Sequence, residues 1–501
     1  MARQVCAQQG SVIAMFAVVL VVLIGFAGLA IELGQVFNRR AEVQALADAA
    51  ALAAARQLNG SAAGIAGALA AAAERVSSTT DGVAYRYGQA YAPWSNAALA
   101  FGASASGPWL DAVSASAAPQ GISFVRVDTG ALGSALTQMD TLFMRVISSA
   151  FDVLQVSARA VAGPYSINIT PLAICAMSPQ AAAARGGELV EYGFRRGVSY
   201  DLMQLDPTDT DGVGAHYLID PIAAPGTSGV AADFALETIK PMVCTGTLAM
   251  PRVTGGPITV LGPFPLAALY GQLNSRFGQY VAPCNVLTAP PDANIKAYSS
   301  AGFFGTTSSW MNASTPPLSG QAAARYPAAP SGGSEKLWTY ADPWPLPAGT
   351  GPDKYGPLWS FARAVPFAAY VPGVAEPAGG YPPFAATQAN WNALYPVNSG
   401  SGAPSLKSVS YPGGSTATPY QATFGSFFAA PATGAPGLRN RRVLNIPLLS
   451  CPVPSGSVTP ATVLAIGRFF MTVPADSSHL YAEFAGIAPE QALSGQLELK
   501  P

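Results

Sequence analysis

The chain has 501 residues, a formal net charge of -1 and only 11% charged residues, against about 25% in an average soluble domain. This charge balance argues against nucleic acid as the main partner, because binding to phosphates needs an excess of basic residues. Half of the residues are hydrophobic, and 51 Gly and 44 Pro accompany them. The composition favours an extracytoplasmic, loop-rich β protein over a cytosolic enzyme, and the length allows more than one domain.

An uncharged apolar run, Ser11–Ile31, follows a short N-terminal segment. Its 21 residues match the roughly 20 that a helix needs to cross the hydrocarbon core of a bilayer. The apolar region of a signal peptide usually has only about 7–15 residues. Gly28-Leu29-Ala30 also reads as a small-x-small cleavage site. On the length criterion we expect a retained transmembrane helix (11–31) after a short cytoplasmic tail (1–10).

The charges around this span specify its orientation only weakly. Arg3 precedes the span, whereas Arg39 and Arg40 follow it, so a count of Lys and Arg places the C-terminal side in the cytoplasm. The secreted-looking composition of the rest of the chain points the other way. We therefore expect a single-pass protein with most of its chain outside the cytosol.

The segment after Glu32 predicts a helix that continues beyond the membrane as an Ala-rich stalk. Its hydrophobic residues recur at helical spacing, at Val36, Val43, Leu46, Ala50, Ala53 and Leu58. Alanine, the best helix former, is frequent among them and lets another element approach closely. We expect this packing at Gln44–Ala55, against the chain's own domain or against other subunits. Residues 59–76 predict a second Ala-rich helix, or a continuation broken at Asn59-Gly60.

The stretch from Gly10 to Leu58 resembles the N-terminal segment of the TadE/TadG-like family of Flp pilus assembly proteins. The shared features are Gly10, an apolar span, Glu32 with Gly34 soon after, Arg39 and Arg40, Gln44, and Asp-Ala-Ala-Ala-Leu-Ala at 48–53. The resemblance implies a bacterial inner-membrane anchor with a periplasmic body. It implies a non-enzymatic scaffold or accessory role in assembling a Flp/Tad (type IVb-like) pilus. The implied partners are the lipid bilayer through residues 11–31, other Tad assembly proteins and, as one option, a second copy.

One departure favours the TadG-like branch of that family, which stays in the membrane as an accessory. Pilins that are processed by the prepilin peptidase are cut after a Gly and carry Glu at the fifth following position. Counting from Gly10 places Met15 there. We therefore expect neither processing nor extraction into a fibre.

Residues 83 to 163 predict a small α+β unit. VAYRYGQAY (83–91) and GISFVRVDT (121–129) alternate like strands, and so does VLQVSARAVAG (153–163). Between them, MDTLFMRVISSAF (139–151) predicts a helix with one apolar side, formed by Met139, Leu142, Phe143, Val146 and Phe151. TLFMRVI followed by VSARAVAG also resembles TadE/TadG-like proteins. Stalk and unit together are expected to span 32–163.

From Pro164 to the C-terminus the pattern predicts a mainly β periplasmic body (164–501), which makes the whole chain α+β. Apolar, β-branched runs bounded by Pro and Gly read as strands: ITPLAICAM, PITVLGPF, VLNIPLLSC, ATVLAIGRFFMTV and AEFAGI, with GFRRGVSYDLMQLDP as a strand-turn-strand. Phe469, Phe470 and Met471 are expected to supply a core face. The closing segment also resembles that of TadG-like proteins.

A loop-rich insertion at about 305–437 interrupts this body. Pro/Gly/Ser clusters alternate there with aromatic residues, among them Trp338, Trp344, Trp359 and Trp391. A flexible linker would lack such aromatics, so we expect ordered loops packed on the body. The alternative is an exposed aromatic surface that contacts glycans or fibres.

Four cysteines follow the span: Cys175, Cys244, Cys284 and Cys451. They have no CxxC spacing, and on an oxidising side of the membrane they could form two disulfides in any of three connectivities. Buried free thiols are the alternative. Cys451 is placed to tie down the late strand pair, with Cys175 as a candidate partner.

Residues typical of catalysis or metal binding are sparse. The chain has two histidines, His216 and His479, and lacks HExxH, GxSxG and Walker motifs. Asp206, Asp209 and Asp211 fail the calcium-loop pattern at its first and twelfth positions, and DTGALGS (128–134) lacks the first serine of a DxSxS metal site. We predict no catalytic residue, metal site, cofactor or small-molecule substrate. The alternatives are an anchored adhesin or glycan-binding module that uses the aromatic loops and, less favoured, a periplasmic hydrolase built around a histidine.

Overall fold

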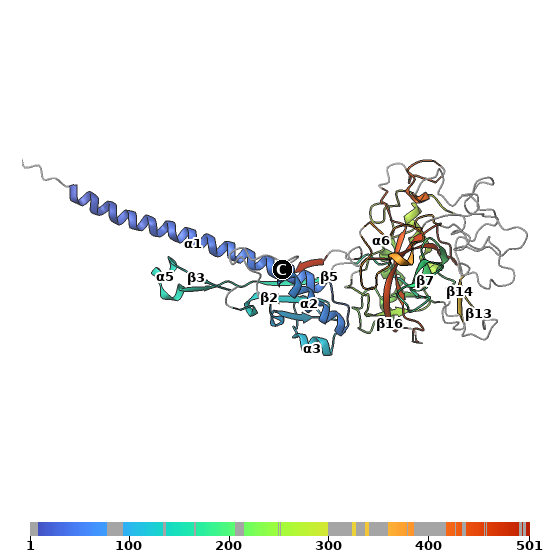
Figure 1. The fold of residues 1–501 in the computed structure, drawn as a ribbon, viewed down its shortest axis with the longest axis horizontal. Helices are drawn as coiled ribbons and strands as arrows, with labels where there is room; N and C mark the ends of the chain where they lie inside the picture. The colour runs from blue at the N-terminus through green and yellow to red at the C-terminus, as the bar shows by residue number, and fades with distance from the viewer. Residues whose placement is uncertain are drawn as a thin grey trace, which may run out of the picture. The chain divides into compact units, whose positions relative to one another are not determined.

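The structure is a computed structural model. It describes residues 9–77, 94–133, 137–164, 167–205, 215–298, 323–326, 336–339, 359–384, 417–489, 493 and 497–500, without residues 249, 251, 378, 426, 433–436, 455 and 457. The predicted α+β class is confirmed, with one long N-terminal helix and a mostly β remainder (Figure 1). The chain forms two compact units. The first comprises Met1–Leu58, Ala62–Gly163 and Leu497–Pro501, and the second comprises Asn59–Ser61 and Pro164–Gln496.

Helix α1, Gln9–Ala55, joins the predicted span and stalk in one continuous element. Within the described ranges it is the one helix that is long and apolar enough to cross a membrane. The large side chains from Met15 to Phe26 are exposed, as expected of a surface that faces lipid rather than a protein core. Farther along, one face of the helix becomes buried.

In the first unit, α1 and α2 (Ala62–Ser77) pack together and against a four-stranded sheet. The strand order is β1 (Leu99–Gly102), β2 (Phe124–Asp128), β5 (Arg159–Pro164), β18 (Leu497–Lys500). Val125 and Val127 point to the buried face of β2, as the two-residue period of a strand requires. Helix α3, Ala112–Ala117, also belongs to this unit.

The C-terminal strand β18 differs from the sequence expectation, which grouped it with the β body. It lies beside β5 in the first sheet, although the whole second unit separates the two strands in the sequence. An edge strand exposes a row of unpaired backbone groups, and β18 satisfies those of β5. The second unit is therefore inserted between the last two strands of the first.

A two-stranded hairpin in the first unit is formed by β3 (Gln138–Asp140) and β4 (Val153–Gln155). Its tip holds the short helix α5 (Met144–Ile147) and a 3-10 turn, Ser149–Phe151. The helix predicted over 139–151 is too long, because strand pairing takes its start and places Met139 opposite Leu154. The strand predicted over 153–163 divides between β4 and β5, which belong to different sheets.

The second unit is built on a sheet that closes on itself. The strands are β6 (Leu172–Cys175), β11 (His216–Ile219), β12 (Pro257–Leu261), β15 (Val443–Leu449) and β16 (Thr459–Met471). Pairings run from β16 through β12, β11, β6 and β15 back to β16. The late part of β16 also pairs with β17 (Tyr481–Ile487), which pairs with β10 (Ser199–Asp201). The predicted strands are present, in an order that their sequence does not specify.

Smaller elements surround this closed sheet. A three-stranded sheet consists of β7 (Ala183–Arg185), β8 (Glu188–Glu191) and β9 (Phe194–Arg195), and β13 (Ala323–Tyr326) pairs with β14 (Lys336–Thr339). The sequence patterns do not predict two helices of this unit, α6 (Leu236–Thr245) and α7 (Leu266–Leu273). Both bury apolar side chains in the main core, such as Ile239 and Leu269. Their short lengths explain why their periodicity was missed.

The core of the second unit contains most of the residues expected there. Phe469, Phe470 and Met471 are fully buried, but Phe470 lies in a separate aromatic cluster with Tyr298 and Tyr420. The prediction that these three residues form one core face is therefore wrong, because neighbouring residues of a strand point to opposite sides of the sheet. Trp359 is buried in the main core. The side chains of Trp338, Trp344 and Trp391, and residues 83–91, lie outside the description.

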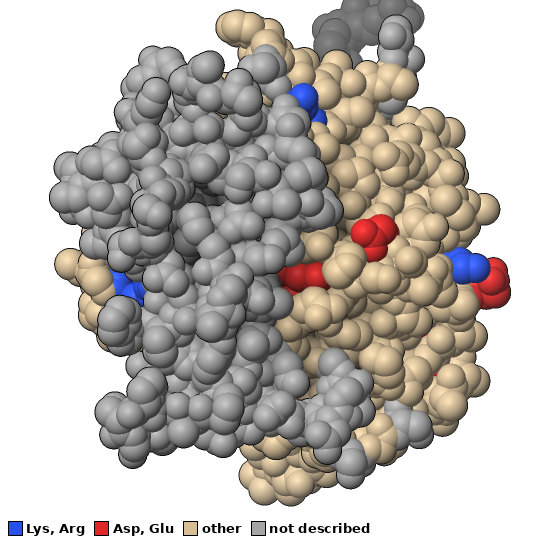
Figure 2. Space-filling model, turned by 90° about the vertical axis from the view of Figure 1, so that its right-hand side faces the viewer, with Lys and Arg blue, Asp and Glu red and all other residues tan. Residues whose placement is uncertain are grey.

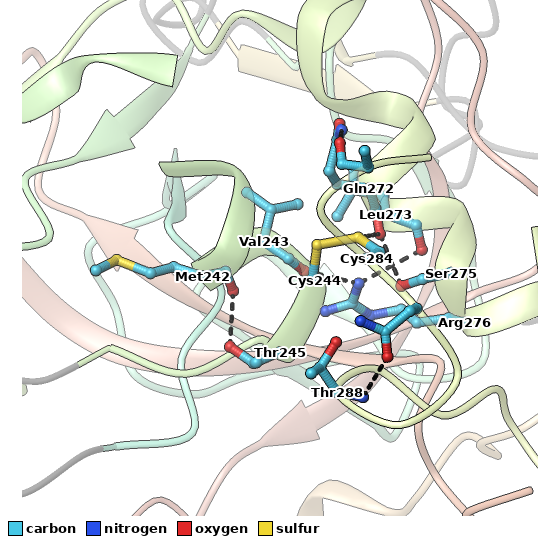
Figure 3. The surroundings of a disulfide bond; sticks show 12 residues. Met242, Val243, Cys244, Thr245, Gln272, Leu273, Ser275, Arg276, Cys284 and Thr288 are labelled. Atoms are coloured by element: carbon cyan, nitrogen blue, oxygen red, sulfur yellow. Dashed lines mark hydrogen bonds between the residues drawn. A yellow bond between two sulfur atoms is a disulfide. The ribbon is translucent and has the colours of Figure 1, made fainter. Parts of the chain in front are cut away.

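Two disulfides join segments of the second unit. Cys175 at the end of β6 bonds to Cys451, just after β15, and Cys244 in α6 bonds to Cys284. Figure 3 shows the second bond beside the buried Arg276, whose guanidinium donates to the carbonyl oxygens of Val243 and Leu273. Figure 2 shows a face of this unit on which the charged groups in view are few.

Candidate functional site at the apolar helix

The side chain of Glu32 in α1 binds the tip of the β3–β4 hairpin. Its carboxylate accepts hydrogen bonds from three consecutive backbone N–H groups: Leu142 to Oε1, Phe143 to Oε2 at 3.0 Å, and Met144 to Oε2 at 2.7 Å. Glu32 is only 5% exposed. These N–H groups lie at the start of α5, where a helix leaves donors unsatisfied and favours negative charge. We call this arrangement the Glu32 clasp.

Gly28 makes room for the same hairpin one turn earlier on α1. Residues four apart lie on one face of a helix, so Gly28 and Glu32 both face the hairpin. A Cβ atom at Gly28 would lie 2.4 Å from the ring of Phe143, closer than real atoms approach. The absence of a side chain therefore lets the Phe143 ring rest directly on the helix backbone.

The motif residue Gln44 makes a second link between α1 and a later segment. Its amide donates to the carbonyl oxygen of Arg159, at the start of β5, and to Asp48 Oδ1 one helical turn on. Asp48 thereby helps to orient Gln44. Gln44 thus links α1 to β5, the strand that follows the hairpin.

The small residues of Gln44–Ala55 pack inside their own unit. Ala47, Ala50, Ala51 and Ala54 are fully buried, in a cluster that also contains residues of α2, β2 and β5. Of the two options left by the sequence, the structure assigns this face of the stalk to the chain's own domain. The same face is therefore not free for another subunit.

The hairpin tip presents apolar side chains that the unit does not cover. Leu142 is 60% exposed and Val146 is 82% exposed, with Phe151 and Val153 close to 40%. Phe143 and Val146 also line an apolar groove of about 250 Å³, together with Val22, Gly25, Phe26 and Leu29 of α1. The hairpin therefore combines a buried carboxylate contact with an exposed apolar tip.

The histidines occupy ordinary structural positions in the second unit. The Nδ1 atom of His216 accepts from Phe264 N–H, and burial lowers the pKa of its ring. The Nδ1 atom of His479 lies 2.6 Å from Asp201 Oδ2, while Asp201 also accepts from Met203 and Leu480 N–H groups. Burial raises the pKa of Asp201, and the bond to His479 opposes this. The His479 contact fixes the turns beside β10 and β17, and the His216 contact joins β11 to the segment after β12.

The acidic residues considered for metal binding also have structural partners where they are described. Asp128 accepts from Gly130 N–H and pairs with Arg159 at 2.6 Å. Across the described ranges, no three His, Cys, Asp or Glu side chains gather in a way that could hold a metal ion. Asp206, Asp209 and Asp211 lie outside those ranges.

Sequence reasoning noted Glu32 and Gly28 but did not identify their contacts. It read Glu32 as a motif residue and Gly28 as part of a cleavage-like triplet. A carboxylate that ends an apolar run on the same helix face as a glycine is a signal for a docking segment, because a charge at that position needs a partner. The sequence does not show which backbone N–H groups bind the Glu32 carboxylate.

Comparison with known families supports the resemblance over the N-terminal segment. Residues 10–57 match the model of the family described as putative Flp pilus-assembly TadE/G-like. This range contains the apolar span, Glu32, Gln44 and the alanine face. No curated protein and no solved structure matches the chain.

Proposed function

We propose that the chain is a non-enzymatic scaffold of a Flp/Tad pilus machine, anchored in the bacterial inner membrane by α1 with its body in the periplasm. The observation that carries the proposal is the match of residues 10–57 to a TadE/G-like Flp pilus-assembly family. The long apolar helix supports anchoring. The partners of such a scaffold are the lipid bilayer and other Tad assembly proteins.

The two units divide the work in this proposal. The first unit holds the anchor, since α1 runs without interruption from the apolar span into its core. The second unit is a closed sheet with two disulfides, and such bonds persist in oxidising compartments such as the periplasm. Their presence supports an orientation with the body outside the cytosol, which the Lys and Arg count alone would reverse.

The orientation of the chain in the membrane is tested by labelling Cys6, which precedes the apolar span. The other four cysteines are paired in disulfides, so Cys6 is the thiol that a maleimide can label. In intact cells with a permeabilised outer membrane, a membrane-impermeant maleimide should leave Cys6 unlabelled until the inner membrane is opened. Labelling before that step would contradict a cytoplasmic N-terminus.

The role in fibre assembly is tested by deletion and complementation in the native bacterium. Surface fibres are counted by electron microscopy in the parent, the deletion strain and the strain complemented with the full chain. The proposal expects fibres to be lost on deletion and restored by the full chain. A complementing variant whose residues 11–31 are replaced by a cleavable signal sequence should fail. Normal fibre numbers in the deletion strain would contradict the proposal.

A further inference from the structure

The exposed apolar surface of α1 does not stop at Glu32. Leu33 is 45% exposed and Phe37 is 62% exposed, both beyond it toward the C-terminus of the helix. Between Met15 and Asn38, Glu32 is the one charged residue, and it is buried beneath the hairpin. A helix that faces lipid on both sides of Glu32 places that carboxylate near the bilayer surface or below it.

The hairpin tip lies at the same level of α1 or deeper. Phe143 packs on Gly28, four residues before Glu32, which is about 6 Å along the axis at 1.5 Å per residue. The groove that Phe143 and Val146 line extends along α1 as far as Val22. The tip therefore reaches into the depth that the apolar span occupies.

We propose that residues 141–152, between β3 and β4, form a second membrane contact whose apolar side chains enter the lipid leaflet beside α1. The exposed Leu142 and Val146 meet acyl chains, and lipid also fills the apolar groove. A bilayer fits better than another protein, because the patch continues the lipid-facing surface of the span. The Glu32 clasp holds the segment in place and satisfies the carboxylate at a depth where an unpaired charge is costly.

The charges of the hairpin agree with this placement. Arg145 is exposed on α5, and its long side chain can extend toward the anionic headgroups while its stem stays in the apolar layer. Asp140 and Asp152 lie at the base of the tip, where Thr141 N–H donates to the Asp152 carbonyl oxygen. The apolar residues thus occupy the tip and the acidic residues occupy its base.

The inference rests on the apolar helix as a membrane span and not on a role in pilus assembly. It is tested with the full chain carrying Cys6→Ser and one new cysteine for a spin label, reconstituted in vesicles of phosphatidylethanolamine and phosphatidylglycerol. Collisions of the label with oxygen, which concentrates in the bilayer, are compared with collisions with a water-soluble nickel chelate. Labels at Val146 and at Val113 of α3 form the matched pair, since both side chains are about 80% exposed.

We expect the Val146 label to collide mostly with oxygen and the Val113 label mostly with the chelate. Adding Glu32→Gln should reverse the ratio at Val146 and leave Val113 unchanged. A chelate-dominated label at Val146 in the parent chain would overturn the proposal. So would a label shielded from both reagents, which would indicate that a second protein chain covers the tip. Each outcome is independent of fibre counts.

Discussion

Two glutamates, one in each unit, hold a loop by the same geometry in opposite surroundings. Glu32 accepts from the N–H groups of residues 142–144, and Glu483 accepts from Ser360, Phe361 and Ala362 N–H at 2.6 to 2.9 Å. The segment held by Glu483 lies beside the buried Trp359, in the core of the second unit. The segment held by Glu32 leaves Leu142 and Val146 exposed.

The difference separates a contact inside a core from a contact that holds an exposed apolar surface in place. In the second unit the carboxylate completes a core that also buries the Arg195–Glu188 pair and links Arg196 to Glu191 and Glu376. Removing a partner there leaves an uncompensated buried charge, so the effect is on stability. In the first unit the clasp positions an apolar surface beside the exposed apolar side chains of α1. We expect its loss to move that surface and to leave the unit folded.

The largest expected effect concerns the disulfides, which lie in the second unit. Removing Cys175–Cys451 with paired Ala substitutions should cost about 6 kcal/mol and removing Cys244–Cys284 about 4 kcal/mol, from chain separations of 276 and 40 residues. Amide hydrogen exchange should show lost protection in β15 and β16, with β2 and β5 unchanged. Equal losses in both units would contradict an effect that is confined to the second unit.

The second largest expected effect is a dependence of the stability of the second unit on pH, through the ionisation of Glu483. Burial raises its pKa to about 7, from an ordinary value of 4.5. Because the folded state holds this proton more tightly than the unfolded chain, the second unit gains stability as pH falls from about 7 to 4.5 and loses it as pH rises through 7. A shift of this size corresponds to about 3 kcal/mol.

Glu483→Gln removes that titration, so the variant should show a flatter stability profile between pH 5 and 7.5 than the parent chain. Urea titration followed by exchange of β16 and β17 amides measures it. Glu74→Gln, at an exposed position of α2, is the matched control and should follow the parent. Parallel profiles for parent and Glu483→Gln would show that Glu483 is ionised throughout this range.

For the Glu32 clasp we expect a local effect of about 1.5–3 kcal/mol, the range for hydrogen bonds to a charged group. Glu32→Gln keeps the size of the side chain but removes its charge and one acceptor oxygen. Exchange of the Leu142, Phe143 and Met144 amides should rise by one to two orders of magnitude, the equivalent of that range. Protection of β2 should not change. If those three amides stay protected, the clasp does not hold the hairpin.

The smallest effect expected is that of Gly28→Ala, which adds one methyl group against the Phe143 ring. Overpacking of this kind costs about 1–3 kcal/mol, and we place the cost at the low end because the tip that carries Phe143 is exposed at Leu142 and Val146. Gly34→Ala is the control, because nothing lies within 4 Å of its Cβ. Chemical crosslinking between α1 and the hairpin should fall for Gly28→Ala alone.

Local patterns predicted many of the elements but not their partners. The long helix α1 followed from an apolar run and an alanine face, and β15 and β16 from β-branched runs, since both signals are local. The pairing of β18 with β5 could not follow, because the strands lie on either side of the second unit. The apolar spacing over residues 139–151 predicts one helix. It does not reveal that strand pairing takes the start of this segment, or that Glu32 binds the backbone at 142–144.

The central proposal is that the unit with the apolar helix carries the role in pilus assembly and the disulfide-bonded unit supports it. It is tested most directly by counting surface fibres in the deletion strain complemented with Glu32→Gln or with Glu483→Gln, at matched levels of membrane-bound protein. The account predicts that Glu32→Gln leaves few fibres and that Glu483→Gln restores the parental number. Full restoration by Glu32→Gln would contradict it.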